Sequence, residues 1–278
     1  MLRLLTIELH KLKYNKSAKV ISIVYFILIT FIALISSIEF NFGDTNFSIA
    51  DQGIFNFPYI WHFNSYIAAI LKLFLAIVIV SMTANEYSNK TLKQNLIDGL
   101  SKKEFIMSKF LTVVLFSLVS TLFVFGVSLV LGLIFSDYNE PGIIFSDIEY
   151  LFAYFIKLIG FFSFCLFLGI LVKRSAFALG FLLIWSITEG IIYSIFKWKI
   201  FKDTEIAESM IQFFPLTAMS NLIKEPFSRL GAVQTAANQL GEAFDKDYSV
   251  QFLTVIIVMV WTFLFIFGSY YVLKKRDL

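Results

Sequence analysis

The sequence predicts an all-α polytopic membrane protein with six transmembrane helices, an N-terminal interfacial helix, a short cytoplasmic helix and short outer helices before the last span. Of the 278 residues, 58% are hydrophobic and only 15% are charged, which lies outside the usual balance of soluble domains. The apolar residues form continuous runs and do not alternate with polar ones, so we expect helices and not the strands of a membrane β-barrel.

One transmembrane domain is expected to take up the whole chain, residues 1–278. A hydrocarbon core about 30 Å thick requires about 20 helical residues, and six apolar runs approach that length. No small-residue cleavage site follows the first run, so we expect it to remain in the mature protein. The predicted spans are residues 20–40, 65–83, 110–135, 151–172, 176–196 and 250–273.

The distribution of Lys and Arg predicts the orientation of the spans. The two shorter outer loops of a six-span arrangement, 41–64 and 136–150, contain no Lys or Arg, whereas the segments on the other side are rich in both. The long outer segment 197–249 contains charges of both signs, but long outer segments follow the charge rule loosely. Basic residues are retained on the cytoplasmic side of a membrane. We therefore expect a multi-pass protein of the bacterial cytoplasmic (inner) membrane with both termini in the cytoplasm.

The N-terminal segment, residues 1–19, predicts an amphipathic helix that lies in the cytoplasmic interface. Leucines recur at helical spacing on one face, and basic residues mark the other. This helix is either a positively charged anchor that sets the orientation or a docking element for a partner. The leucines are Leu2, Leu5, Leu9 and Leu12, and the opposite face carries Arg3, His10 and Lys13.

Residues 85–100, between the second and third spans, predict a short surface helix with one apolar stripe. Leu92, Leu96 and Leu100 recur at every fourth residue, and Gly99 can close the helix. A partner or the membrane surface has to cover such a stripe. The alternative is a solvated loop that only separates two spans.

The outer segment 197–249 is too long for a plain connection. Its apolar stretches are divided by Pro215, which predicts short helices that pack on the outer ends of the spans or dip into the membrane. A soluble loop without a special purpose is the competing interpretation.

Three ionisable residues, Lys72, Lys157 and Glu189, interrupt apolar spans. Counted from the outer ends of their spans, they fall at similar depths. A charge inside a membrane costs free energy unless it is paired or hydrated, so we expect Glu189 to form an ion pair with one of the lysines. Alternatively, both lysines reach up to the outer headgroups.

Catalytic and metal-binding motifs are missing from the sequence. It has no phosphate-binding loop GxxxxGK[ST], no HExxH pair and no GxSxG elbow, and its single cysteine, Cys165, lies in an apolar run. We therefore expect no enzymatic activity and no bound cofactor or metal. His62 and Asp51 are the one hint of a membrane enzyme acting on lipid, but a histidine beside Trp61 is more typical of an interfacial belt. The net charge of +3 does not suggest nucleic acid.

The order of these pieces resembles the ABC-2 type permeases, the membrane subunits of ABC exporters. The resemblance covers nearly the whole chain and is most specific after the second span. The matching pieces are the N-terminal helix with its basic residues, the pair Glu86-Tyr87 followed by Thr91-Leu92, the run Leu100 to Phe105, Lys109, the stretch Phe214 to Leu222 and the basic end Lys274-Lys275-Arg276. The chain departs from the family at Lys90, where members often carry glycine, and at Lys102 and Lys103.

The resemblance implies a permease that pairs with a second permease chain, the same or related, among membrane lipids. Residues 85–100 would be a coupling helix seated on a cytoplasmic ATPase dimer, which binds ATP and Mg²⁺. That ATPase would cover the leucine stripe, and a basic group at the membrane edge or on the partner would fix Glu86. The implied coupling residues are Glu86, Tyr87, Thr91, Leu92, Leu96 and Leu100.

A different class of function also fits the sequence. The chain could be a non-transporting accessory or receptor-like membrane protein that binds a partner through residues 197–249.

The substrate of a permease is not determined by this sequence. Aromatic-rich spans favour an amphipathic, peptide or lipid-like cargo over a small ion, but lipid-facing phenylalanines give the same composition.

Overall fold

The computed structural model describes residues 2–36, 39–42, 45–48, 52–201, 204–239 and 246–276. Within these residues six helices are long and apolar enough to cross a membrane. The predicted fold class, an all-α polytopic membrane protein, is confirmed. A small antiparallel hairpin of β1 (Glu39–Phe42) and β2 (Thr45–Ser48) is the one sheet in the described part of the chain.

The six long helices lie close to the predicted spans, with shifted ends. The first span starts earlier than predicted, and residues 39 and 40, the last two of the predicted span, belong to strand β1. The second span runs on to Ser88, so the first residues of the predicted helix 85–100 are its last turn. The long helices are α2 (Lys16–Ile35), α3 (Tyr59–Ser88), α5 (Lys102–Phe135), α7 (Glu149–Val172), α8 (Ser175–Ile195) and α12 (Phe252–Lys274).

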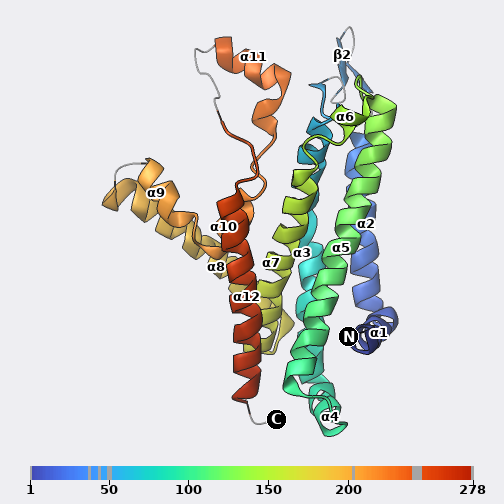
Figure 1. Ribbon diagram of the computed structural model, residues 1–278, viewed down its shortest axis with the longest axis vertical. Helices are drawn as coiled ribbons and strands as arrows, with labels where there is room; N and C mark the ends of the chain where they lie inside the picture. The colour runs from blue at the N-terminus through green and yellow to red at the C-terminus, as the bar shows by residue number, and fades with distance from the viewer. Residues whose placement is uncertain are drawn as a thin grey trace.

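Helix α7 occupies the centre of the bundle, where it packs against α3, α5, α8 and α12 (Figure 1). It is the most deeply buried of the six spans, and α8 is the least buried. Figure 1 shows α8 leaning away from the other spans as it runs towards α9 (Thr204–Ile211). The bundle core therefore lies around α3 and α7, and α8 touches it along one side only.

The two ends of the bundle differ in structure (Figure 1). One end, which we call the basal end, carries both chain termini, helix α1 (Leu2–Tyr14) and helix α4 (Thr91–Ile97). The opposite, distal end carries the β1–β2 hairpin, α6 (Pro141–Ile144), the 3-10 turn η3 (Phe227–Arg229) and α11 (Gly231–Gln239). A π-helical turn η2 (Phe196–Ile200) and helix α10 (Pro215–Asn221) follow α8. The predicted short helices of segment 197–249 are thus present.

Local sequence explains where several helices begin. Asn15 separates α1 from α2, and its side chain accepts a hydrogen bond from the backbone N–H of Ala18. Ser101 and Glu104 form a reciprocal capping box at the start of α5. These caps satisfy backbone donors that the first turn of a helix leaves without partners, so they fix the points at which α2 and α5 enter the bundle.

Three buried hydroxyl groups join α2, α5 and α7 inside the core. The hydroxyl of Tyr25 lies 2.6 Å from that of Ser120 and 2.7 Å from that of Tyr154, and the last two are 2.9 Å apart. All three side chains are fully buried. In such a triangle each hydroxyl can donate one bond and accept another, so no polar group is left unsatisfied in an apolar environment.

Candidate functional site

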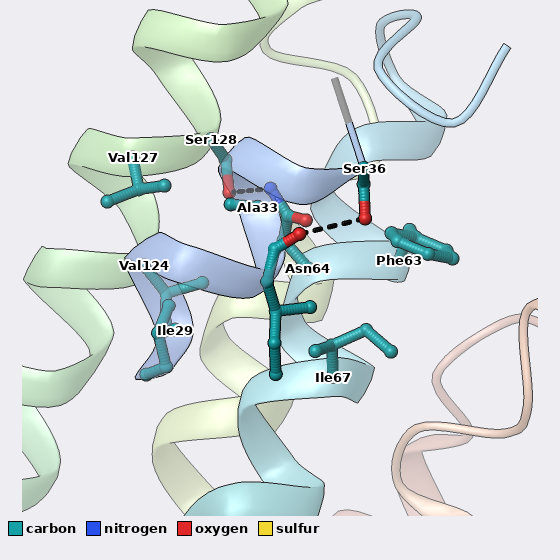
Figure 2. Close-up of a pocket in the computed structure, with 10 residues that line it drawn as sticks. Ile29, Ala33, Ser36, Phe63, Asn64, Ile67, Val124, Val127 and Ser128 are labelled. Atoms are coloured by element: carbon teal, nitrogen blue, oxygen red, sulfur yellow. Dashed lines mark hydrogen bonds between the residues drawn. The ribbon is translucent and has the colours of Figure 1, made fainter. Parts of the chain in front are cut away.

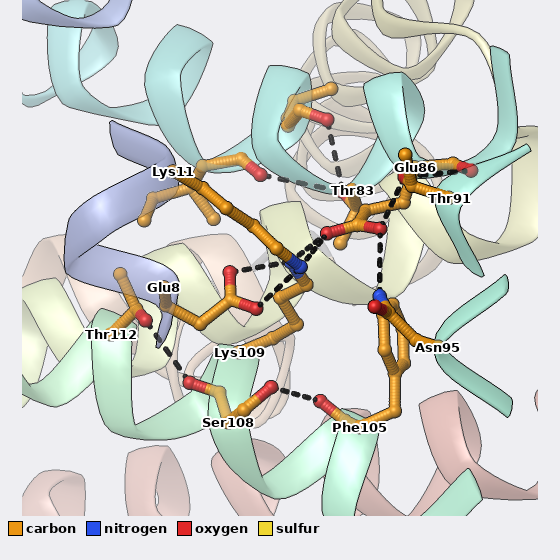
Figure 3. A network of polar contacts seen from close by, with 12 residues as sticks. Glu8, Lys11, Thr83, Glu86, Thr91, Asn95, Phe105, Ser108, Lys109 and Thr112 are labelled. Carbon is orange, nitrogen blue, oxygen red and sulfur yellow. Dashed lines mark hydrogen bonds and ion pairs between the residues drawn. The ribbon is translucent and has the colours of Figure 1, made fainter. Parts of the chain in front are cut away.

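The most extensive charged cluster in the described residues lies buried at the basal end, where α1, α3, α4 and α5 meet (Figure 3). Its members are Glu8 and Lys11 of α1, Glu86 near the end of α3 and Lys109 of α5. The side chains of Glu8, Glu86 and Lys109 are at most 4% exposed, whereas that of Lys11 is 36% exposed. We call these four residues the basal charge network.

Lys109 is the centre of the basal charge network. Its Nζ donates to a carboxylate oxygen of Glu8 at 2.5 Å and to Oε1 of Glu86 at 2.8 Å. Lys11 donates to the same Glu86 oxygen at 2.7 Å and to Glu8 at 3.3 Å. Two carboxylates thus face two ammonium groups, so the network is neutral as a whole. Opposite charges and hydrogen bonds of this kind offset the cost of burying ions.

The electrostatics of Lys11 reflect the two acids beside it. Partial burial on its own would lower the pKa of this ammonium group. The hydrogen bond to Glu86 and the charges of Glu8 and Glu86 outweigh that effect, so the pKa of Lys11 is raised above its ordinary value of 10.5. Lys11 therefore stays positively charged at neutral pH and keeps α1 attached to α3.

The second oxygen of Glu86 holds α4. Its Oε2 accepts a bond of 2.6 Å from the hydroxyl of Thr91 and one of 3.3 Å from the side-chain amide of Asn95 (Figure 3). Both donors lie on α4, one turn apart. A single carboxylate therefore connects α4 to α1 and α5 through charged hydrogen bonds, which are stronger than neutral ones.

Helix α4 has only seven residues and defined ends. It begins after Lys90, whose φ of +56° puts a residue with a side chain in the left-handed region. It ends in a Schellman motif: Gly99, with a φ of +97°, donates to the carbonyl of Leu96, and Leu100 donates to that of Asn95. The predicted closing role of Gly99 is confirmed. The left-handed conformation at Lys90 explains why glycine is favourable at this position.

The leucine stripe of α4 faces the protein's own core. Leu92 is 1% exposed, and Leu96 and Leu100 are half-buried against the same core. The expectation that a partner covers all three leucines is therefore wrong. The large apolar side chain that α4 leaves uncovered is Ile97, which is 70% exposed, and the exposed Lys93 and Gln94 lie on the preceding turn.

The C-terminal segment is attached to the same end. The guanidinium group of Arg276 donates to the carbonyls of Ile170 and Leu171 at 2.5 and 2.8 Å and to the hydroxyl of Tyr87 at 3.2 Å. These carbonyls belong to the last turn of α7, where a cation is favourable. Tyr87, predicted as a coupling residue, thus contacts the end of the chain, whereas its neighbour Glu86 contacts α4.

The expected intramembrane ion pair does not form. The carboxylate of Glu189 is occupied by donors of Trp185, Leu216 and Thr217. Lys72 donates to the backbone carbonyl of Ala69, and Lys157 donates to that of Ser220. The expectation failed because the sequence does not show that backbone groups of the outer segment reach this depth. Neither lysine has an acidic partner among the described residues.

His62 is a structural contact of the outer segment. His62 stacks on Tyr150 with ring centroids 4.2 Å apart, and its ring nitrogens bond the carbonyl of Lys224 and the guanidinium of Arg229. It therefore holds the outer segment on α3, and Asp51 lies outside the described residues. No group of three metal-binding side chains was found in the described part of the chain.

A small pocket lies between α2, α3 and α5 (Figure 2). Its lining is apolar apart from Ser36, Asn64 and Ser128. The amide of Asn64 donates to the hydroxyl of Ser128 at 2.9 Å, and Ser36 donates to a backbone carbonyl of its own helix. None of the residues that line this pocket is ionisable, so it offers no charged group for catalysis or metal binding.

The sequence predicts Glu86, Thr91 and the helix that carries Thr91 as parts of the site, but it does not predict the other three members of the basal charge network. Glu8 and Lys11 lie on the face of α1 that meets the bundle, while Leu9, assigned to the apolar stripe, is 41% exposed. A signal was available: Glu8 is four residues from both Leu4 and Leu12, so an acid interrupts the apolar face. The sequence marks Lys109 as the start of the third span and as part of the family resemblance, but it does not predict the partners of Lys109.

Comparison with protein families identifies a match that covers most of the chain. A family model described as "ABC-2 family transporter protein" matches residues 4–197, which is more than half of the chain. The match includes α1, α3, α4 and α5, the elements that form the basal charge network. No curated protein is similar enough to the chain to count as a match.

Proposed function

Since this chain belongs to the ABC-2 transporter family and is a multi-pass ABC transporter permease, we propose that it works as an exporter driven by a separate ATPase subunit. The ATPase would bind ATP and Mg²⁺, and this chain would form the membrane path together with a second permease chain. The basal end would face the cytoplasm, in agreement with the Lys and Arg distribution. The membrane would be the bacterial cytoplasmic (inner) membrane.

The observation that carries this proposal is the attachment of α4 through Glu86. Helix α4 contacts α3 at its beginning, and Glu86 connects it to α1 and α5 as well. A partner that pushes on α4 would therefore displace three membrane-associated helices together. This is the mechanical requirement for a subunit that converts ATP-driven closure into a tilt of the spans.

The partner-facing surface follows from the exposure of α4. Its core-facing leucines are covered by the chain itself, so the ATPase would contact Ile97 together with Lys93 and Gln94. A single exposed isoleucine with polar neighbours fits a small docking interface with one apolar anchor. The leucines would support the helix from behind and would not bind the ATPase directly.

The test is a pull-down of the tagged chain from its native membrane after mild extraction, followed by an ATPase assay on the complex. We expect a P-loop ATPase to co-purify. The variant Ile97→Asp should lose most of this subunit, whereas Ile206→Asp, the same change at an exposed isoleucine of α9, should retain it.

Two results would contradict the proposal. If no nucleotide-binding subunit co-purifies even after crosslinking, the chain is better explained as an accessory or receptor-like protein that uses residues 197–249. If an ATPase binds equally well to Ile97→Asp, the permease assignment stands but α4 is not the docking element.

A further inference from the structure

Helix α10 is held at both ends by charged side chains from two different spans. It packs against α7, α8 and α12, and Pro215, Ala218 and Met219 within it are buried. The charged side chains are Glu189 of α8 and Lys157 of α7. These are two of the three intramembrane charges, and they contact the same short helix instead of each other.

The N-terminal end of α10 depends on Glu189. Phe214 at the N-cap has no side-chain acceptor, and Pro215 at the first position has no N–H. The next two backbone donors, Leu216 and Thr217, bond the two carboxylate oxygens of Glu189 at 3.1 and 2.8 Å. One side chain of α8 thereby satisfies the donors that this helix leaves open.

Two further donors complete the surroundings of this carboxylate. The hydroxyl of Thr217 bonds it at 2.9 Å, and the indole N–H of Trp185 bonds it at 2.7 Å. All four groups donate, and the positive end of the α10 dipole points at the carboxylate. A glutamine in place of Glu189 would present an N–H₂ group to at least one of these donors, so it could not make the same set of bonds.

The C-terminal end of α10 is held more weakly. Lys157 donates to the carbonyl of Ser220 in the last turn at 3.3 Å, which suits the negative end of the helix dipole. At the other end, just before α10 begins, the indole of Trp261 in α12 donates to the carbonyl of Phe213 at 2.8 Å. The strongest set of bonds to α10 thus comes from α8, and the weaker one comes from the central span α7.

We propose that Glu189 is a positioning residue that makes the start of α10 move with α8, while the end of α10 stays against α7. This inference rests on the proposed function, because a permease has to tilt its spans. Helix α8 is the least buried span and leans away from the bundle, so it is the span that can move with the smallest loss of packing (Figure 1). A tilt of α8 would then pivot α10 and change the access to the bundle from the distal end.

The first experiment measures how well α10 is protected. In a chain with Cys165→Ala, the substitution Ala218→Cys puts a reporter thiol at a fully buried position of α10. A membrane-impermeant maleimide, added from the distal side to the protein in lipid vesicles, should react slowly with it. Adding Glu189→Gln should raise the labelling rate at least tenfold, and Lys157→Met should raise it less.

The matched control is Glu208→Gln. Glu208 is an exposed glutamate of α9 that accepts one long bond of 3.4 Å from Tyr193, also on α8. It should leave the labelling rate of the reporter unchanged. If Glu189→Gln leaves it unchanged as well, Glu189 does not hold α10 and the proposal is overturned.

The natural thiol of Cys165, buried in α7, serves as the check on folding. In a chain that carries Glu189→Gln as its single substitution, the thiol of Cys165 should stay unreactive. If Cys165 becomes reactive, the bundle itself has opened, and the milder variants Glu189→Asp and Thr217→Val are then used to test whether Glu189 holds α10. Both variants should raise the labelling rate of the Ala218→Cys reporter without exposing Cys165. If neither does so, Glu189 does not hold the start of α10 and the proposal is refuted.

A second arm separates this inference from the proposed function. The labelling test needs neither ATP nor a partner, so it is decided even if no ATPase exists. In the complex with the co-purified ATPase, ATP should change the labelling rate of the Ala218→Cys reporter, and Glu189→Asp should reduce that change. A complex that hydrolyses ATP without any change at the reporter would refute the coupling between α8 and α10 and leave the permease assignment intact.

Discussion

Replacing Lys109 with methionine removes the central cation of the basal charge network. Methionine has a similar length and no charge, so the change leaves Glu8 and Glu86 buried with Lys11 as their one remaining cation. The site then carries an uncompensated negative charge in a place that water barely reaches. We expect a large loss of stability together with a loosening of α4.

The magnitude follows from the two distances. At an effective dielectric constant of about 20, charges at 2.5 and 2.8 Å attract each other by about 6 kcal/mol for each pair. The cost of taking the ions out of water offsets several kcal/mol of this attraction. Removing one partner of a buried pair leaves that cost in place, so we expect Lys109→Met to lower the free energy of unfolding by about 3 to 5 kcal/mol.

The assay is reversible unfolding in mixed detergent micelles, with Lys103→Met as the control. Lys103 is exposed on the first turn of α5, and its replacement should change the free energy of unfolding by less than about 0.5 kcal/mol. The double variant Glu86→Gln with Lys109→Met restores neutrality, so it should be more stable than the sum of the single losses predicts, by about 2 kcal/mol. A loss below about 1 kcal/mol in Lys109→Met, or strict additivity in the double variant, would refute the reasoning.

Three further changes test other parts of the fold, each by the same unfolding assay unless stated. Lys90→Gly should stabilise the chain by up to about 1 kcal/mol because it relieves a left-handed backbone, whereas Lys93→Gly inside α4 should destabilise it by about the same amount. Tyr25→Phe leaves the hydroxyls of Ser120 and Tyr154 with one bond between them and should cost about 1 kcal/mol; an unchanged stability would mean that the triangle contributes nothing. Arg276→Met should make the C-terminus more susceptible to carboxypeptidase, since three hydrogen bonds to α7 and Tyr87 are lost, while Lys275→Met should not.

The spans could be predicted because a membrane-crossing helix is set by local composition. Apolar runs of the required length stand out without any knowledge of their neighbours. The ends were harder, as Glu39 and Phe40 show: they directly follow the first apolar run in the sequence, yet they pair with a second strand. Strand pairing depends on residues elsewhere in the chain, which periodicity does not reveal.

The candidate site was predictable in part. Glu86, Thr91 and the short helix are local features, and the cap at Gly99 follows from its residue type. The face of α4 that meets the core was not predictable, because a leucine stripe looks the same whether it packs inward or against a partner. A basic group beside Glu86 was expected, but Lys109 is separated from Glu86 by 23 residues and from Glu8 by 101, so the sequence did not identify Lys109 as that group.

The small size of α4 has a consequence for the order in which this protein is assembled. A seven-residue helix is not stable by itself in water, since isolated helices shorter than about 12 to 15 residues are marginal. Of the two lysines that pair with its supporting carboxylate, Lys11 belongs to α1 but the fully buried Lys109 belongs to α5, which leaves the ribosome later. We therefore expect the surface of α4 to be fixed in its final form after the third span has been inserted, so that an unfinished chain would not present the docking surface proposed above.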